Sequence, residues 1–252
     1  MSDAPKIVTA GMLVIGNEVL SGRTRDTNTN FIATRLTELG IRLREARVIP
    51  DDEAVIIASV REMSARFDYV FTSGGIGPTH DDITADCIAK AFNVPLSVHP
   101  EARGRLERHY PAGGLNEARL RMARVPEGGT LIDNPVSIAP GFRIGNVFVM
   151  AGVPNVMQAM FDSIRHELVG GAKLYSRTLS SFALEGQIAS GLAAIQNRHA
   201  DLEIGSYPFM RQGRAGASIV LRGTDEARLA EATEEVRVLM DGFDGEPREV
   251  NV

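Results

Sequence analysis

The sequence predicts an α/β protein: a three-layer α/β/α domain with a mostly parallel sheet, followed by a small α+β domain. Strand-like and helix-like segments alternate through the first two thirds of the chain, and the first strand, Ile7 to Ile15, is almost continuously apolar. A strand that is covered on both faces needs such a run, and right-handed crossover helices supply the cover. The 252 residues suffice for two domains, expected at 1–170 and 171–252 with the joint at Gly170-Gly171.

The first elements follow from periodicity. The first strand ends at Gly16, and the apolar residues of segment 28–39 then recur at helical spacing before Gly40, a typical helix stop. Segment 41–49 is expected as the second strand. The turn at 50–52 then leads to an amphipathic helix over 55–63.

The remaining elements follow the same alternation. In the larger domain we expect a strand, three helices, a strand and a helix at 69–72, 82–92, 101–109, 116–122, 146–152 and 157–164. In the smaller domain we expect strand, helix, strand, strand and helix at 174–179, 185–196, 202–207, 217–221 and 226–240.

The most informative segment is the turn TSGGIGPTHDDIT, residues 72–84. Its three glycines let the main chain approach a ligand closely, so that their amides can face an anionic group. Asp82, when it holds a metal ion, would offset the repulsion between its carboxylate and a phosphate. The alternative is structural, with Gly-Pro as a turn and Asp81 as a helix cap. The crevice rule for parallel sheets favours a ligand site, at which the IGNE, PDD, GGIGP and AGVP segments should converge.

Composition excludes several classes of protein. The net charge of −5 and the pI near 5.6 argue against a nucleic-acid partner, because such binding needs a concentrated positive face. The single cysteine, Cys87, excludes an internal disulfide framework and fits a reducing compartment. No apolar run is long enough to span a membrane, and the N-terminus lacks a signal-peptide pattern, so we expect a cytoplasmic protein. The arginines of segment 103–124 are expected mainly on a solvated helical face, with ligand contact as the alternative.

The glycine-rich turn resembles the signature of the MoaB/Mog, or molybdopterin-binding, fold. The similarity is strongest to the competence/damage-inducible protein A (CinA) family, and other segments agree in order: IGNEVLSG, NTN, VIPDD, LNEARLRMARVPEG, APGF and AGVPNVM. FALEGQIASGL and IGSYP resemble the KH-type small domain of that family. The similarity implies a short form without the C-terminal amidase domain of longer relatives.

The resemblance also implies a chemistry. Relatives transfer adenylate to molybdopterin with acids that match Asp51 and Asp82, or cleave ADP-ribose or FAD with a divalent metal ion (Mg²⁺, Mn²⁺ or Co²⁺). Asp51 and Asp82 are therefore the implied catalytic and metal-binding acids, with Glu18 as a further ligand or base. The expected partner is a small nucleotide or a pterin such as molybdopterin, and relatives form homo-oligomers. The expected ligand-binding residues are Ser73, Gly74, Gly75, Gly77, Pro78, Thr79, Asn28, Asn30, Gly152 and Pro154.

Alternatives stay open for two candidate site residues and for the function of the protein. Asn28 and Asn30 are either helix caps or part of the pocket. Asn17, Ala151 and Val156 stand where relatives commonly carry aspartate, proline and glutamate. A metal-dependent nucleotide pyrophosphatase is the first hypothesis. The alternatives are a non-catalytic protein that binds molybdopterin or an adenine nucleotide, and a molybdopterin adenylyl transferase. The GRAG segment at 213–216 is expected as a hairpin turn rather than a nucleic-acid-binding KH loop.

Overall fold

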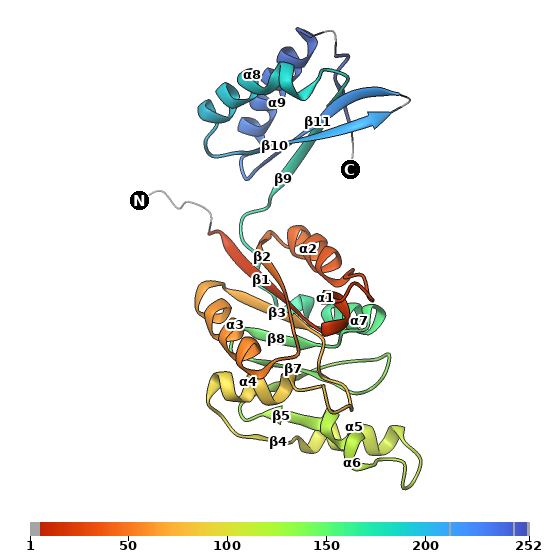
Figure 1. Cartoon of the computed structure of the whole chain (residues 1–252). Coiled ribbons are helices and arrows are strands. Elements are labelled where there is room, and N and C mark those ends of the chain that lie inside the picture. Colours follow the sequence, from red (N-terminus) through yellow and green to blue (C-terminus); the bar gives the residue numbers. More distant parts are fainter. Residues whose placement is uncertain (1–5, 212, 244, 251–252) are drawn as a thin grey trace. The chain divides into compact units, whose positions relative to one another are not determined.

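The computed structural model describes residues 6–211, 213–243 and 245–250 (Figure 1). The chain forms two compact units, Met1–Gly171 and Ala172–Val252, and each has a hydrophobic core of its own. The larger unit is a three-layer α/β/α fold. No helix in the described part of the chain combines the length and the apolar character that a bilayer crossing requires.

A mixed sheet forms the middle layer of the larger unit. Among the described residues it has six strands in the order β2-β1-β3-β8-β7-β6. The first four are parallel, and β7 and β6 extend the edge in antiparallel pairing. In chain order the strands are β1 (Val8–Ile15), β2 (Ile41–Ile49), β3 (Tyr69–Ser73), β6 (Thr130–Ile132), β7 (Gly141–Ile144) and β8 (Val147–Met150).

The central strands are buried because side chains from both of their faces enter a core. In β1, Met12 and Val14 belong to one core, whereas Leu13 and Ile15 belong to the other. This alternation has the period of two that a strand imposes. It explains why an almost continuously apolar run predicts this strand correctly.

Helices cover both faces of the sheet. Helices α2 (Asn28–Glu38) and α7 (Pro154–Ile164) cover one face, and α3 (Glu53–Arg66) and α4 (Thr84–Phe92) cover the other. Phe161 of α7 packs against Phe71 of the sheet with ring centroids 5.8 Å apart. Full burial of one such ring stabilises the fold by roughly 1.5–3 kcal/mol.

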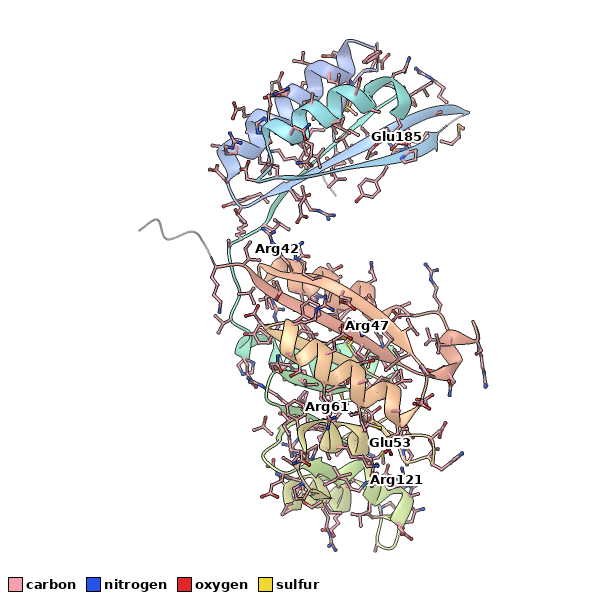
Figure 2. The ribbon with its side chains drawn as sticks, turned by 60° about the vertical axis from the view of Figure 1, so that its left-hand side comes forward. Arg42, Arg47, Glu53, Arg61, Arg121 and Glu185 are labelled. Carbon is pink, nitrogen blue, oxygen red and sulfur yellow. The ribbon has the colours of Figure 1, made fainter. Side chains whose placement is uncertain are left out.

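Polar contacts on the surface tie α3 to the C-terminal end of α4. The guanidinium of Arg61 donates to the main-chain oxygens of Lys90 and Ala91, at 2.9 and 3.0 Å. Lys90 in turn pairs with Glu53 at 2.5 Å. Figure 2 shows Glu53 and Arg61, both on α3. These groups are solvent-exposed, so each contact contributes little to stability, but together they fix the helix that follows the glycine-rich turn.

Residues 96–126 form an excursion from the main sheet. Its elements are β4 (Leu96–Val98), α5 (Pro100–His109), α6 (Glu117–Leu120), a 3₁₀ turn (Arg121–Ala123) and β5 (Arg124–Pro126). The two helices were expected from the sequence, but the short antiparallel β4–β5 pair was not. Arg124 ties the excursion to α4 through a two-pronged ion pair with Asp86, at 2.7 and 3.0 Å.

The smaller unit is an α+β fold. Its sheet has the order β10-β11-β9-β12 within the described residues, and its core is filled by α8 and α9 against the sheet. In chain order the elements are β9 (Tyr175–Ser181), α8 (Glu185–Arg198), β10 (Glu203–Arg211), β11 (Arg214–Gly223), α9 (Glu226–Asp241) and β12 (Arg248–Glu249). The GRAG segment lies at the β10–β11 hairpin, with Gly213 in the left-handed region at φ 76°, which confirms the hairpin prediction. The KH-type assignment stays a prediction.

Candidate functional site

A cavity of about 530 Å³ lies at the carboxyl ends of the parallel strands. Its lining comes from the loops that follow β1, β2, β3 and β8, represented by Glu18, Asp51, Gly75 and Gly152. The predicted convergence of the IGNE, PDD, GGIGP and AGVP segments is therefore confirmed. The cavity has the size of a typical small-molecule site.

The glycine-rich turn presents only part of its main chain to this cavity. The amide of Gly74 donates to the carbonyl of Met150 at 3.1 Å, so the expectation that it faces a ligand is wrong. The amides of Gly75, Ile76 and Gly77 have no acceptor among the described residues. These three consecutive donors line the cavity and are the available anion-binding groups.

Close packing explains why the turn requires glycine. A Cβ on Gly74 would lie 2.1 Å from the carbonyl oxygen of Ile15, at the end of β1. Gly75 has a left-handed φ of 68°, and a Cβ there would lie 2.2 Å from Oγ1 of Thr84. The hydroxyl of Thr84 donates to the carbonyl of Gly74 at 3.0 Å and anchors the turn to the start of α4.

Asp82 lies in the loop and not in the helix. Helix α4 begins at Thr84 rather than at Asp82, and its N-cap, Ile83, makes no side-chain capping bond, so the alternative of Asp81 as the cap is also wrong. The Oδ2 atom of Asp82 accepts from the amide of Thr79 at 2.8 Å and from its hydroxyl. Among the described residues no donor reaches Oδ1, and the carboxylate lines the cavity.

Asp51 is held in a similar way. Its Oδ2 accepts from the amide of Asn17 at 2.9 Å, and its other oxygen has no donor in the described part of the chain. Glu18 lies over Gly16, where a Cβ would come within 2.4 Å of the Glu18 carboxylate. Four acids from three loops therefore line one cavity, namely Glu18, Asp51, Asp81 and Asp82, and Asp51 and Asp82 are each fixed through one oxygen.

The side chain of Asn28 holds together the strand ends on which the candidate site is built. Its side-chain nitrogen donates to the hydroxyl of Ser73 at 2.7 Å and to the carbonyl of Gly152 at 2.8 Å, and the residue is only 5% exposed. Asp26 accepts from the first amides of α2, at 2.9 and 3.2 Å, so the interpretation of Asn28 and Asn30 as caps is wrong. The Ser73 hydroxyl donates to the carbonyl of Ala151 at 3.2 Å.

The structure brings together most of the expected site residues. Those that line the cavity are Glu18, Asp51, Gly74, Gly75, Gly77, Pro78, Asp82, Gly152 and Pro154. Four expected ligand contacts do not line it, namely Asn28, Asn30, Ser73 and Thr79. Their hydroxyl and amide groups are typical of ligand contacts, but the sequence does not reveal that three of them are committed to internal hydrogen bonds.

The expected site residues do not include the whole lining of the cavity. Ser137 and Ala139 lie beside or within the quoted APGF segment, and Met122 lies within LNEARLRMARVPEG. Asn134 carried no signal, because it belongs to none of the quoted segments. Further lining residues without an assigned role are Ile15, Thr24, Ile76, Asp81, Val153 and Met160.

The arginines of segment 103–124 mostly have internal partners. Arg105 pairs with Asp133 at 2.6 Å, and Arg124 pairs with Asp86. Arg121 reaches the loop itself, donating to the main-chain oxygen of Asp82 at 3.1 Å. A purely solvated face therefore does not describe this segment, since one arginine buttresses the loop that holds Asp82.

The acids of the cavity offer oxygen ligands that could hold a divalent cation, but within the described residues they do not form a closed metal cage. Within the described residues no group of three or more histidine, cysteine, aspartate or glutamate side chains could hold a metal ion. Magnesium usually takes one or two protein carboxylates and completes its shell with water and phosphate oxygens. Asp51 and Asp82, each with one oxygen free of protein donors, satisfy this requirement.

Comparison with known proteins gives a family match for each of the two units. Residues 11–170 match the family model described as "Probable molybdopterin binding domain", and residues 173–243 match "FAD synthase, middle domain". A protein of Archaeoglobus fulgidus is 33% identical over 231 residues, which cover 91% of this chain and 97% of that protein. A probable FAD synthase of Caenorhabditis elegans is 31% identical, and the match covers 94% of this chain but only 51% of that protein.

A solved structure agrees with these matches. The crystal structure of CinA from Thermoplasma acidophilum is 36% identical, with a TM-score of 0.59, and the alignment covers 63% of this chain and 98% of that one. The likeness thus extends over nearly the whole of the solved chain. The chain belongs to the molybdopterin-binding domain family, as a CinA-like member with the MoaB/Mog fold.

Proposed function

We propose that the cavity binds a small nucleotide by its phosphates and cleaves a pyrophosphate bond of the ADP-ribose or FAD type with the help of a divalent cation. One observation carries the proposal: three consecutive free amides and the carboxylates of Asp51 and Asp82 line the same cavity. Amides bind phosphate oxygens, and carboxylates bind hard cations. The likeness to a probable FAD synthase, which extends over 94% of this chain, supports this choice of ligand.

Different groups of the chain would bind the phosphates, hold the cation and accept a proton. The amides of residues 75–77 would hold the bridging and terminal phosphate oxygens and stabilise the charge that develops on them. Asp51 and Asp82 would hold the cation, whose role when bound is to neutralise phosphate charge. Glu18, which lines the cavity from the β1 side, would accept a proton from the attacking water.

The test is hydrolysis of ADP-ribose by water to AMP and ribose 5-phosphate with Mg²⁺, Mn²⁺ or Co²⁺. Asp51 and Asp52 are adjacent, which supplies a matched pair of variants. Asp51→Asn should lower the rate by about 100-fold or more. Asp52→Asn should leave it unchanged, because Asp52 caps α3 by accepting from the amide of Val55 at 3.0 Å and asparagine caps equally well. Absence of AMP with every cation, or equal effects of the two variants, contradicts the proposal.

The second candidate is binding without turnover, of molybdopterin or an adenine nucleotide. It is favoured by Val156 and Ala151, which line the cavity with apolar surface beside Pro154. Calorimetry separates the two candidates, since tight binding followed by recovery of intact ligand supports this one. Adenylyl transfer to molybdopterin would instead be recognised by formation of the adenylylated pterin from ATP.

A further inference from the structure

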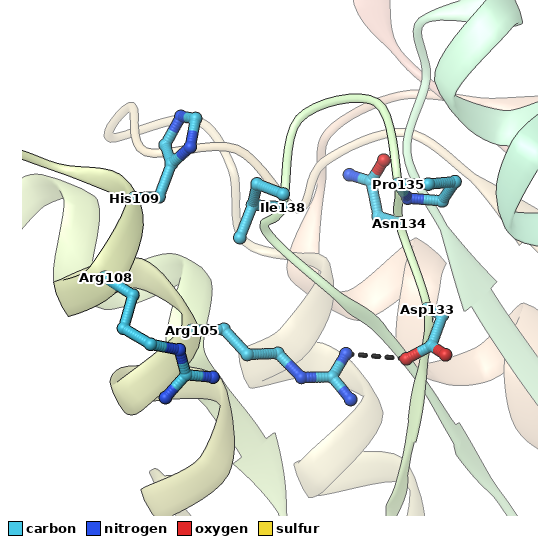
Figure 3. Close-up of a pocket in the computed structure, with 7 residues that line it drawn as sticks. All are labelled: Arg105, Arg108, His109, Asp133, Asn134, Pro135 and Ile138. Carbon is cyan, nitrogen blue, oxygen red and sulfur yellow. Dashed lines mark hydrogen bonds and ion pairs between the residues drawn. The ribbon is translucent and has the colours of Figure 1, made fainter.

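A second cavity, of about 500 Å³, lies between helix α5 and the loop that runs from Asp133 to Ile138 (Figure 3). Helix α5 contributes Arg105, Arg108 and His109 to its lining. The loop contributes Asn134, which also lines the cavity of the glycine-rich turn. The two cavities are therefore neighbours that share one wall.

The charge of the second cavity is positive. Arg105 is paired with Asp133 and with Glu101, at 2.6 and 2.7 Å. Arg108 has no acidic partner among the described residues, and Asp133 is the one acid of the lining. Basic residues at a helix C-terminus also complement the helix dipole. That effect accounts for the charge of the last turn but not for a cavity that combines two arginines, a histidine and an asparagine.

Internal hydrogen bonds hold the loop that forms the shared wall in one conformation. Asn134 is buried, and its side chain makes four hydrogen bonds to the loop, two to Ser137 and one each to Val136 and Ala139. These bonds hold Ile138 at a left-handed φ of 68°. A β-branched residue rarely adopts this conformation, and strain of this kind concentrates at ligand clamps.

In this conformation, neighbouring residues of the loop line different cavities. Ser137 and Ala139 line the first cavity, whereas Ile138 between them lines the second. Figure 3 shows Ile138 between His109 and Asn134.

We propose that the second cavity is a phosphate-binding subsite, which receives a phosphate monoester through Arg108, Arg105 and His109. Guanidinium and imidazole groups are suited to phosphate oxygens because their N–H donors form charge-assisted hydrogen bonds. Occupation of both cavities by one molecule rests on the proposed function and requires a ligand with a phosphate besides the group on the glycine-rich turn. The subsite itself requires no turnover.

Titration of the full chain with inorganic phosphate tests the subsite. Binding is measured by calorimetry and by NMR of the arginine Nε–H and main-chain amide signals. We expect shifts of the Arg105 and Arg108 signals. Arg108→Gln should weaken phosphate binding about tenfold. Arg108→Lys should restore most of it. Arg103→Gln is the matched control on the same helix, and it should bind phosphate as the parent chain does, because Arg103 does not line this cavity and pairs with Glu107 at 2.7 Å.

ADP-ribose, which carries a pyrophosphate bridge but no phosphate monoester, separates this proposal from the proposed function. Arg108→Gln should leave the shifts that ADP-ribose causes in the amides of residues 75–77 unchanged. If ADP-ribose fails to shift these amides while inorganic phosphate still shifts the Arg108 signal, the proposed function fails and the subsite stands. If phosphate shifts only the amides of residues 75–77, or if Arg108→Gln and Arg103→Gln bind phosphate equally well, the subsite is overturned.

Discussion

The side-chain amide of Asn28 donates to the hydroxyl oxygen of Ser73 across 2.7 Å, in a place almost closed to solvent. The same nitrogen also reaches the carbonyl of Gly152 at 2.8 Å, so one side chain connects the start of α2 to the ends of β3 and β8. The floor of the candidate site therefore depends on a residue that does not line it.

Replacement of this residue should loosen the floor. Asn28→Ala removes two buried hydrogen bonds and leaves two acceptors without a donor, so we expect a loss of about 2 kcal/mol or more in the free energy of unfolding. Urea denaturation measures this loss. Asn30→Ala changes an exposed residue in the same turn and should cost less than about 0.5 kcal/mol. Equal costs for the two variants would refute the role assigned to Asn28.

A pair of glycines separates backbone strain from close packing. Gly75 and Gly22 have nearly the same left-handed φ, 68° and 73°, but a Cβ would meet Thr84 at Gly75 and nothing within 4 Å at Gly22. Gly22→Ala should cost about 1–2 kcal/mol from strain alone. Gly75→Ala should cost about 1–3 kcal/mol more because it also overpacks the turn. The difference between the two midpoints of denaturation measures the steric part, and no difference would contradict the packing described.

The single thiol should be unreactive toward thiol reagents in the native protein. Cys87 is fully buried in α4, and burial raises the pKa of its thiol to about 11. Because the thiolate is the reactive form, we expect no reaction with Ellman's reagent at pH 8 until the chain unfolds, when one equivalent should react. Rapid labelling under native conditions would show that α4 opens readily.

The ion-pair network on β2 and α3 should give stability that depends on pH. Hydrogen bonds from Arg47 and Arg66 lower the pKa of the Glu62 carboxyl from 4.5 to about 2. A lowered pKa in the folded state means that the contribution is complete above about pH 4.5 and is lost as the pH falls toward 2. The stability difference between the parent chain and Glu62→Gln should therefore be constant at neutral pH and shrink across that window. A difference that stays constant down to pH 2 would contradict the network.

The sequence predicted the parts of the fold whose patterns are long. The apolar run of β1 and the helical spacing in α2 extend over 8 and 11 residues, and each was recognised almost to its ends. Strands β4 and β5 have three residues each, too few to show a period, and their pairing depends on contacts that bring distant segments together. The same holds for the antiparallel edge formed by β6 and β7.

The candidate site was predictable as a meeting of loops but not as a set of contacts. Parallel strands deliver their following loops to one edge, so the convergence of the glycine-rich turn with Asp51 follows from topology. The roles of Asn28 and Ser73 could not be predicted, because a polar side chain has the same sequence signal whether it binds a ligand or a neighbouring loop. Metal binding, turnover and the expected homo-oligomer remain predictions for experiment.

The partition at residues 134–139 has a consequence for how this chain can vary. Ser137 lines the cavity of the glycine-rich turn, whereas its neighbour Ile138 lines the second cavity. A substitution at either residue therefore changes one cavity directly and the other through the shared backbone. Substitutions on the two sides should then give non-additive effects in double-mutant cycles. The ligand preference of one cavity therefore cannot be changed at this loop without a change in the other cavity.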